Sequence, residues 1–179
     1  LIHHQQIIHK DLHPGNIVVG SETLADGSHR MRVQIIDFGL SSLLTREQPS
    51  QKTPETLEGI LAYISPEQTG RMNRALDYRC DFYTLGITFY QLLSGRQPFK
   101  ASDALGMVYA HMASVQTPLS ETRNEVPTAL SQIVDKLMHK NAESRYQSAL
   151  GLKHDLQQCL HRLKQPGAFN KDQPLTLGE

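Results

Sequence analysis

Residues 7–19 read IIHKDLHPGNIVV, and the interpretation of the whole chain depends on this stretch. An apolar pair leads into a charged triplet, a Pro-Gly turn follows, and a β-branched run begins after Asn16. Asp11 and Asn16 therefore stand five residues apart in a turn that leads into a strand. Taken alone, this pair fits a catalytic loop or a surface turn with ordinary capping residues.

Length and composition indicate an ordinary globular domain. The chain has 179 residues, of which 39% are hydrophobic and 20% charged. Lys plus Arg and Asp plus Glu both number 18, so the net charge of zero gives no reason to expect nucleic acid or an anionic membrane as a partner. No apolar run approaches the roughly 20 residues of a membrane span, and the first ten residues are too polar for a signal peptide.

The cysteines and histidines do not predict a metal centre. Cys80 and Cys159 lie far apart in apolar-periodic stretches, without zinc or disulfide spacing. We expect both to be buried thiols in a reducing cytosol, and we predict a cytoplasmic protein. The nine histidines do not form a ligand pattern either.

Patterning predicts an α+β fold that is mostly helical, with one small hairpin near its start. Residues 1–9 are interpreted as the end of a helix, and apolar runs at 17–20 and 31–39 as the two strands of the hairpin. Residues 41–58 are polar, carry two prolines and predict a long loop. At 65–70, SPEQTG is typical of a helix start with Ser65 as N-cap.

The second half of the chain shows helical periodicity. Apolar residues recur three and four positions apart in four segments: 80–94, 102–113, 127–139 and 147–163. The remaining residues, 164–179, break at Pro166-Gly167 and are interpreted as a linker.

The hairpin predicts a cluster of oxygen ligands. Asp11 and Asn16 precede its first strand, and Asp37 ends its second, so the three lie near one edge. Two carboxylates and an amide oxygen suit Mg²⁺, which shares its hard oxygen ligands with substrate phosphates. One carboxylate then remains to accept a hydroxyl proton.

Three motifs resemble those of protein kinases. HKDLHPGN at 9–16 resembles the catalytic loop, DFG at 37–39 matches the metal-binding motif, and SPE at 65–67 resembles the Ala-Pro-Glu motif. They occur in kinase order and at kinase-like separations. Residues 77–99 and 140–148 also resemble kinase segments. Residues 1–163 therefore resemble a kinase carboxyl-terminal lobe: catalytic loop, β-hairpin, activation segment, then a helical bundle.

The resemblance is closest to a bacterial subgroup of Ser/Thr-kinase-like domains. Members of this subgroup typically stand at the front of hybrid sensor histidine kinases that also carry an ATPase module. By this resemblance, 164–179 lead toward a downstream module that is absent here.

The resemblance implies roles for individual residues. Asp11 would orient and deprotonate the attacking hydroxyl, with His13 as a second catalytic residue near the γ-phosphate. Asn16 and Asp37 would hold Mg²⁺ against the phosphates of ATP. Residues 40–64 would be the activation segment.

Five further residues would serve the structure of the site. His9 and Phe38 would stack between catalytic loop and core, and Asp81 would anchor the loop backbone. The expected ion pair at the Pro-Glu motif joins Glu67 to Arg145.

Three positions depart from the usual kinase pattern. Lys10 replaces an Arg that grips an activation-loop phosphate, although Thr53 and Thr56 remain candidate phosphorylation sites. His13 stands where a Lys is usual, and Ile60 where Thr is usual.

No GxGxxG occurs in the sequence, and the chain begins about ten residues before Asp11. The Gly-rich loop, the strand Lys and its helix Glu all lie on a kinase amino-terminal lobe. We therefore expect this lobe to be absent, the chain to be a fragment, and the fragment alone to bind ATP very weakly and to lack useful catalysis.

Three functional hypotheses remain open. The first is a protein Ser/Thr kinase acting in bacterial signal transduction on a protein substrate or on downstream modules of its own chain. The second is a pseudokinase-like module that senses nucleotide or regulates a hybrid histidine kinase. The third is a small-molecule phosphotransferase, which the Pro-Glu motif and the helix after it disfavour.

Overall fold

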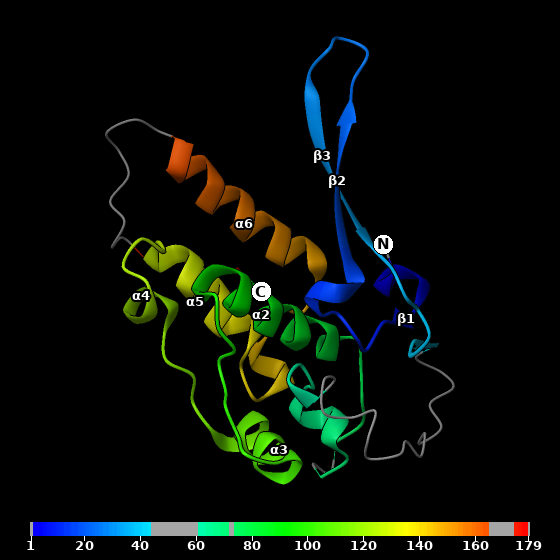
Figure 1. Cartoon of the computed structure of the whole chain (residues 1–179), viewed down its shortest axis with the longest axis vertical. Helices are drawn as coiled ribbons and strands as arrows, with labels where there is room; N and C mark the ends of the chain where they lie inside the picture. The colour runs from blue at the N-terminus through cyan, green and yellow to red at the C-terminus, as the bar shows by residue number, and fades with distance from the viewer. Residues whose placement is uncertain (1, 44–60, 72–73, 165–173, 179) are drawn as a thin grey trace.

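The computed structural model describes residues 2–43, 61–71, 74–164 and 174–178. Within these ranges the chain combines helices with two small antiparallel sheets, in agreement with the α+β prediction. The helices gather into one body, and the β2–β3 hairpin projects away from it (Figure 1).

The first nine residues differ from the expected helix end. A single 3₁₀ turn, η1 (His3–Gln5), is followed by the short strand β1 (Ile7–Ile8). β1 pairs antiparallel with β4 (Ser42–Leu43), with Ile8 opposite Ser42. Gln6 ends the turn with a φ of 58°, a left-handed conformation that stops helix propagation. The apolar spacing here reflects a buried strand residue, since Ile8 is fully buried.

The predicted hairpin is confirmed, with a longer first strand than expected and a second strand that begins and ends earlier. A 3₁₀ turn, η2 (Pro14–Asn16), leads into β2 (Ile17–Thr23), which pairs antiparallel with β3 (His29–Ile35). The register sets Ile17 opposite Ile35 at the base and Thr23 opposite His29 at the tip. Gly27 turns the chain with a φ of 79°, a conformation that glycine adopts without steric cost.

The predicted helices are present with small shifts at their ends. After the 3₁₀ segment η4 (Pro66–Thr69), the helices follow as α2 (Arg79–Ser94), α3 (Ala104–Ala113), α4 (Leu119–Thr122), α5 (Thr128–Leu137) and α6 (Ala149–Lys164), with the 3₁₀ turn η5 (Ala142–Ser144) before the last. Asp103 caps α3 by accepting a hydrogen bond from the backbone of Gly106. α4 was not predicted, because one helical turn is too short to show periodicity.

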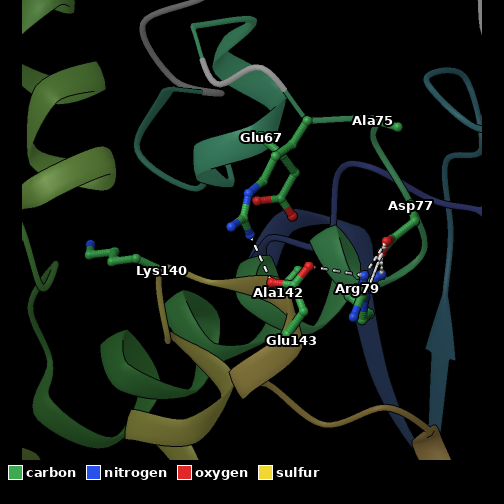
Figure 2. A pocket seen from close by; sticks show the side chains of 8 residues that line it. Glu67, Ala75, Asp77, Arg79, Lys140, Ala142 and Glu143 are labelled. Carbon is green, nitrogen blue, oxygen red and sulfur yellow. Dashed lines mark hydrogen bonds and ion pairs between the residues drawn. The ribbon is translucent and has the colours of Figure 1, made fainter.

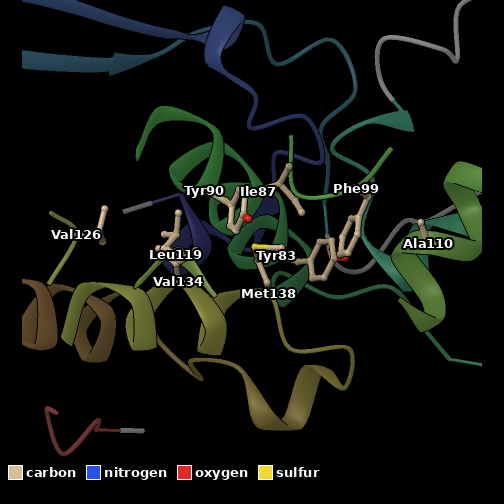
Figure 3. Close-up of a cluster of buried hydrophobic side chains, with 9 residues drawn as sticks. All are labelled: Tyr83, Ile87, Tyr90, Phe99, Ala110, Leu119, Val126, Val134 and Met138. Atoms are coloured by element: carbon tan, nitrogen blue, oxygen red, sulfur yellow. The ribbon is translucent and has the colours of Figure 1, made fainter. Parts of the chain in front are cut away.

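Two clusters of buried side chains form the core around α2 and α5. The first joins α2 to the segments that follow it (Figure 3), with the members Tyr83, Ile87, Tyr90, Phe99, Ala110, Leu119, Val126, Val134 and Met138. The second joins α2, α5 and α6, with the members Phe82, Ala129, Ile133, Leu137, Tyr146, Leu152, Cys159 and Leu175. Both cysteines are buried, as predicted.

Gly86 permits the close contact between α2 and α5. A Cβ at this position would lie 2.8 Å from Leu137 Cβ and 2.8 Å from Met138 Cγ. The two helices therefore pack more closely here than any larger side chain would allow.

The expected linker, 164–179, contains residues that belong to the folded body. Residue 164 is the last residue of α6, and Leu175 is a buried member of the second cluster. Of the described part of the chain, no helix has the length and apolar character needed to cross a bilayer.

Candidate active site

The loop that carries Asp11 is held by a buried carboxylate of α2. Asp81 is 1% exposed and accepts hydrogen bonds from the backbone N–H groups of His9, at 2.9 Å, and Lys10, at 2.7 Å. His3 Nε2 lies 2.9 Å from the same carboxylate. Lys10 has a φ of 71°, a strained conformation for a non-glycine residue. Asp81 helps to hold this strained backbone, which confirms the anchoring role predicted for it.

Two side chains that the sequence analysis missed complete the support of this loop. Thr88 donates from Oγ1 to the carbonyl of Leu12 at 2.7 Å, and Gln68 donates from Nε2 to the carbonyl of Lys10 at 3.0 Å. Thr88 lies seven residues after Asp81, so both project from one face of α2. That spacing was a readable signal for a second anchor.

His9 connects the loop to the end of the hairpin. It is fully buried; its Nε2 lies 3.1 Å from the carbonyl of Ile36, and its ring centroid lies 4.8 Å from that of Phe38. The predicted contact of His9 with Phe38 is thus confirmed, but the rings meet edge to face, at 61°, and Phe38 is partly exposed. This contact fixes the start of the DFG motif relative to Asp11.

Asp11 and Asn16 are in direct contact. Asn16 donates from Nδ2 to the backbone carbonyl of Asp11 at 3.0 Å and to its carboxylate at 3.1 Å. Both residues are buried, with Asp11 8% and Asn16 7% exposed. Because Nδ2 is used in these bonds, Oδ1 of Asn16 is left as the acceptor that a cation would need.

His13 lies against the Asp11 carboxylate. Its Nδ1 accepts a hydrogen bond from the backbone of Gly15 at 3.1 Å, and its Nε2 lies 3.6 Å from Asp11 Oδ2. An accepting Nδ1 places the proton of the neutral ring on Nε2, which faces the carboxylate. Tyr63 packs against the same ring, with 5.5 Å between the ring centroids.

Asp37 reaches the same edge from the second strand. The backbone N–H of Ile36 donates to the carbonyl of Asn16 at 3.0 Å, so Asp37 follows directly after this contact. Asp37 has a φ of 61°, and its exposed carboxylate accepts a hydrogen bond from Gly39 at 3.0 Å. Asp37 thus lies one residue beyond a backbone contact with Asn16, and the convergence of the Asp11, Asn16 and Asp37 side chains stays a prediction.

The oxygen set at this edge fits a magnesium ion that also binds phosphate. Asn16 Oδ1 and the exposed Asp37 carboxylate are hard oxygen ligands, and Mg²⁺ commonly takes only one or two protein ligands besides phosphate and water. No cluster of three or more His, Cys, Asp or Glu ligands is found among the described residues. Such a cluster is not required for a metal held largely by substrate.

Glu67 and Arg145 form the predicted ion pair. Arg145 donates from Nη1 and Nη2 to the two carboxylate oxygens of Glu67, at 2.6 and 2.9 Å. Arg145 also donates to three backbone carbonyls, those of Arg79, His139 and Lys140. It is 1% exposed, so the guanidinium replaces its water shell entirely with protein groups.

A polar cavity of about 320 Å³ lies beside this pair (Figure 2). Its charged side chains already have partners: Arg79 binds Asp77 at 2.7 Å, and Arg74 binds Glu143 at 2.8 Å. Burial acts to raise the pKa of Asp77, but hydrogen bonds from Arg79 outweigh it and lower that pKa. These internal pairs indicate a structural role for the cavity.

Some predicted features fall outside the described residues. Thr53, Thr56 and Ile60 belong to this group, as does most of the expected activation segment, so the structure does not test them.

Several known proteins are similar in sequence to this chain. The family model described as "Protein kinase domain" matches residues 1–157. A probable serine/threonine-protein kinase PknB of Bifidobacterium longum is 31% identical over 154 residues, which are 86% of this chain and 21% of that protein. The serine/threonine-protein kinase PknB of Mycolicibacterium smegmatis is also 31% identical over 154 residues, which are 23% of its length.

A third relative matches a shorter part of the chain. Hybrid signal transduction histidine kinase G of Dictyostelium discoideum is 46% identical over 95 residues, which are 53% of this chain and 3% of that protein. The chain therefore spans less than a quarter of each of these relatives.

Proposed function

The chain belongs to the protein kinase family, and from this premise we propose that it forms the catalytic-loop side of a protein Ser/Thr kinase. In this proposal residues 1–163 are the carboxyl-terminal lobe, and the γ-phosphate of ATP passes to a Ser or Thr hydroxyl. The observation that carries the proposal is the bonded pair of Asp11 and Asn16, held at the end of the hairpin next to Asp37.

Asp11 is the proposed acceptor of the substrate hydroxyl proton. Its carboxylate is oriented by the Asn16 amide and flanked by His13 Nε2. In phosphoryl transfer, catalysis consists mainly of positioning and charge stabilisation, so a carboxylate fixed in this way orients the attacking oxygen.

Asn16 and Asp37 are the proposed Mg²⁺ ligands. The ion, when bound, supplies positive charge that neutralises the phosphate oxygens. The anchoring of the loop by Asp81 and of the DFG start by His9 keeps the two ligands in register.

The β2–β3 hairpin supports an amino-terminal kinase lobe as the partner of this half-site. Val19, Met31 and Val33 are 60%, 74% and 59% exposed. They share one face, because Val19 is paired with Val33 and Ser21 with Met31. An apolar face of this kind is typical of an interaction surface, and it adjoins the edge where the nucleotide would lie.

We place this kinase in the cytoplasm, in bacterial signal transduction, with a protein substrate or downstream modules of its own chain as partner. The likeness to the PknB kinases supports the enzymatic part. The likeness to a hybrid histidine kinase supports a role inside a multi-module signalling protein.

His13 also supports a second candidate function, a pseudokinase-like regulatory module. Its imidazole, bonded to Gly15 and facing Asp11, lacks the permanent charge that a lysine would bring to a phosphate. Nucleotide binding without phosphotransfer would then be the output.

Phosphotransfer from labelled ATP distinguishes the two candidates. The test protein joins these residues to an amino-terminal kinase lobe, with Asp11→Asn and Asp37→Ala as variants and any histidine-kinase module disabled. We expect acid-stable phosphate on Ser or Thr that both variants lose by at least about 100-fold. The 179-residue chain alone should give none.

Absence of label from the folded, nucleotide-binding protein would overturn the kinase proposal in favour of the regulatory one. His13→Lys sharpens the result. We expect it to raise the rate, because a permanent positive charge would then lie beside Asp11.

A further inference from the structure

The residues Pro174–Gly178, called the strap below, lie outside any helix or strand and pack on α5 and α6. Their burial alternates: Pro174 and Thr176 are exposed, while Leu175 is buried and Leu177 half-buried. Burial that alternates with a period of two is typical of an extended peptide that contacts a protein along one of its faces. Leu175, 5% exposed, inserts between residues of both helices in the second core cluster.

Side chains of α5 pair with the strap backbone at both of its ends. Gln132 Oε1 accepts a hydrogen bond from the N–H of Leu175 at 3.0 Å. Lys136 donates from Nζ to the carbonyl of Gly178.

Side chains of α6 pair with the strap in the same way. Arg162 donates to the carbonyl of Pro174 at 3.1 Å, and the Asp155 carboxylate accepts from the N–H of Gly178 at 3.0 Å. Two helices thus satisfy four backbone groups of one short segment. This pattern resembles the way proteins hold extended peptides, with main-chain bonds for affinity and pockets for alternate side chains.

Asp155 is a buried polar residue of this face that binds the strap backbone. It is fully buried, and its Oδ2 accepts hydrogen bonds from Tyr146 Oη at 2.8 Å and from the Gly178 amide. A buried carboxylate is costly unless donors satisfy its oxygens. Removing the strap would take away one of these donors and would expose the apolar pocket of Leu175.

We propose that the face formed by α5 and α6 is a peptide-docking site whose resident ligand is the strap of the same chain. The ligand pattern is apolar–any–apolar, recognised by the Leu175 pocket and the edge contact of Leu177, and the carboxylate of Asp155 accepts from the backbone N–H that follows. This site is separate from the phosphotransfer site and does not depend on the proposed kinase activity. Covalent connection gives the strap an effective concentration in the millimolar range, so modest intrinsic affinity suffices for occupancy.

Hydrogen exchange on the unmodified chain gives the first test. We expect the amides of Leu175 and Gly178 to exchange at least about 10-fold more slowly than unstructured-chain rates, because both are bonded to side chains of the helical body. If both amides exchange at unstructured-chain rates, the strap is not docked and the proposal is overturned.

Binding in trans gives the second test. In the full chain, Leu175→Asp places a charge in the apolar pocket and should release the strap. A fluorescein-labelled peptide of residues 171–179 should then bind the variant at least 10-fold more tightly than it binds the unmodified chain. Thr176→Asp is the matched control, since it adds the same charge on the exposed side and should leave the peptide excluded.

A second peptide, with Ser in place of both leucines, tests whether binding requires the apolar side chains. It should not bind. Failure of the labelled peptide to bind a folded Leu175→Asp chain would overturn the proposal, as would equal binding to the Thr176→Asp control. If the Leu175→Asp chain is unfolded by circular dichroism, the exchange rates of the unmodified chain decide the matter.

Discussion

The β2–β3 hairpin and the helical body both carry regular apolar patterns, but only the helical body buries them. Val33 in the hairpin is 59% exposed, whereas Ile133 and Leu137 in α5 are fully buried. The difference arises because α5 packs against α2, α4 and α6, while the two hairpin strands pair chiefly with each other. A hairpin alone is marginal in water, so its stability depends on its base.

The candidate site lies at the junction of these two regions. Its loop is anchored from the helical side by Asp81 and Thr88, and the hairpin contributes Asp37 through its base. Changes in the helical body should therefore alter stability strongly, and changes along the free hairpin weakly. Four pairs of variants test this contrast.

Arg145→Ala should lower the free energy of unfolding by about 3–5 kcal/mol, because it leaves the buried Glu67 carboxylate without its partner. Urea denaturation followed by circular dichroism measures this. Arg74→Ala is the matched control, since it breaks an exposed pair with Glu143 and should cost less than about 1 kcal/mol. Equal effects would show that burial does not set the strength of these pairs.

Ile133→Ala should cost about 2–5 kcal/mol, because it opens a cavity in the second core cluster. Val33→Ala in β3 should cost less than about 0.5 kcal/mol, since more than half of that side chain is in water. Thermal unfolding of both variants tests the contrast directly. A large loss for Val33→Ala would mean that the hairpin face is covered in solution.

Acid should destabilise the helical body through His111. Burial, followed by the charge of Lys140, lowers the pKa of His111 to about 4, below its usual value of 6.5. The unfolded chain therefore binds more protons between pH 6.5 and pH 4. Stability should fall as pH falls through this window, by up to about 3 kcal/mol.

His111→Gln should flatten that part of the stability–pH curve, as measured by urea denaturation at several pH values. His29→Gln, at the exposed tip of the hairpin, controls for the loss of a histidine. An unchanged slope in His111→Gln would contradict the assignment to His111.

Gly86→Ala should cost about 1–3 kcal/mol, because the new Cβ would lie 2.8 Å from atoms of Leu137 and Met138. Gly20→Ala in β2 meets no heavy atom within 4 Å and should be neutral or slightly stabilising. Differential scanning calorimetry of the pair measures both shifts. A neutral Gly86→Ala would show that the helix contact can widen without cost.

The elements that the sequence predicted best are those with several periods of apolar repeat. α2, α5 and α6 show three or more helical turns, and their bounds agree with prediction to within about two residues. β1 and α4 were missed, because two strand residues or one helical turn carry no readable period. The left-handed φ of Gln6 and the pairing of β1 with β4 arise from tertiary contacts, not from local preference.

The candidate site was predicted from motif order, and its internal bonds were predicted only in part. The contacts of Asp81, of His9 with Phe38 and of Glu67 with Arg145 followed from the resemblance and are confirmed. The positions of Gln68 and Tyr63 beside the loop depend on how the segment after residue 60 folds back. The sequence gives no sign that Leu175 docks, because its partners lie on helices distant in sequence.

Arg145 also determines how this body opens. Its guanidinium joins Glu67, the start of α2 at Arg79 and the backbone before η5 through one side chain. If one of these segments moved away alone, buried donors of Arg145 would lose their acceptors. Opening one segment therefore costs about as much free energy as opening all three together. These three segments therefore behave as a single cooperative unfolding unit, to which the hairpin tip does not belong.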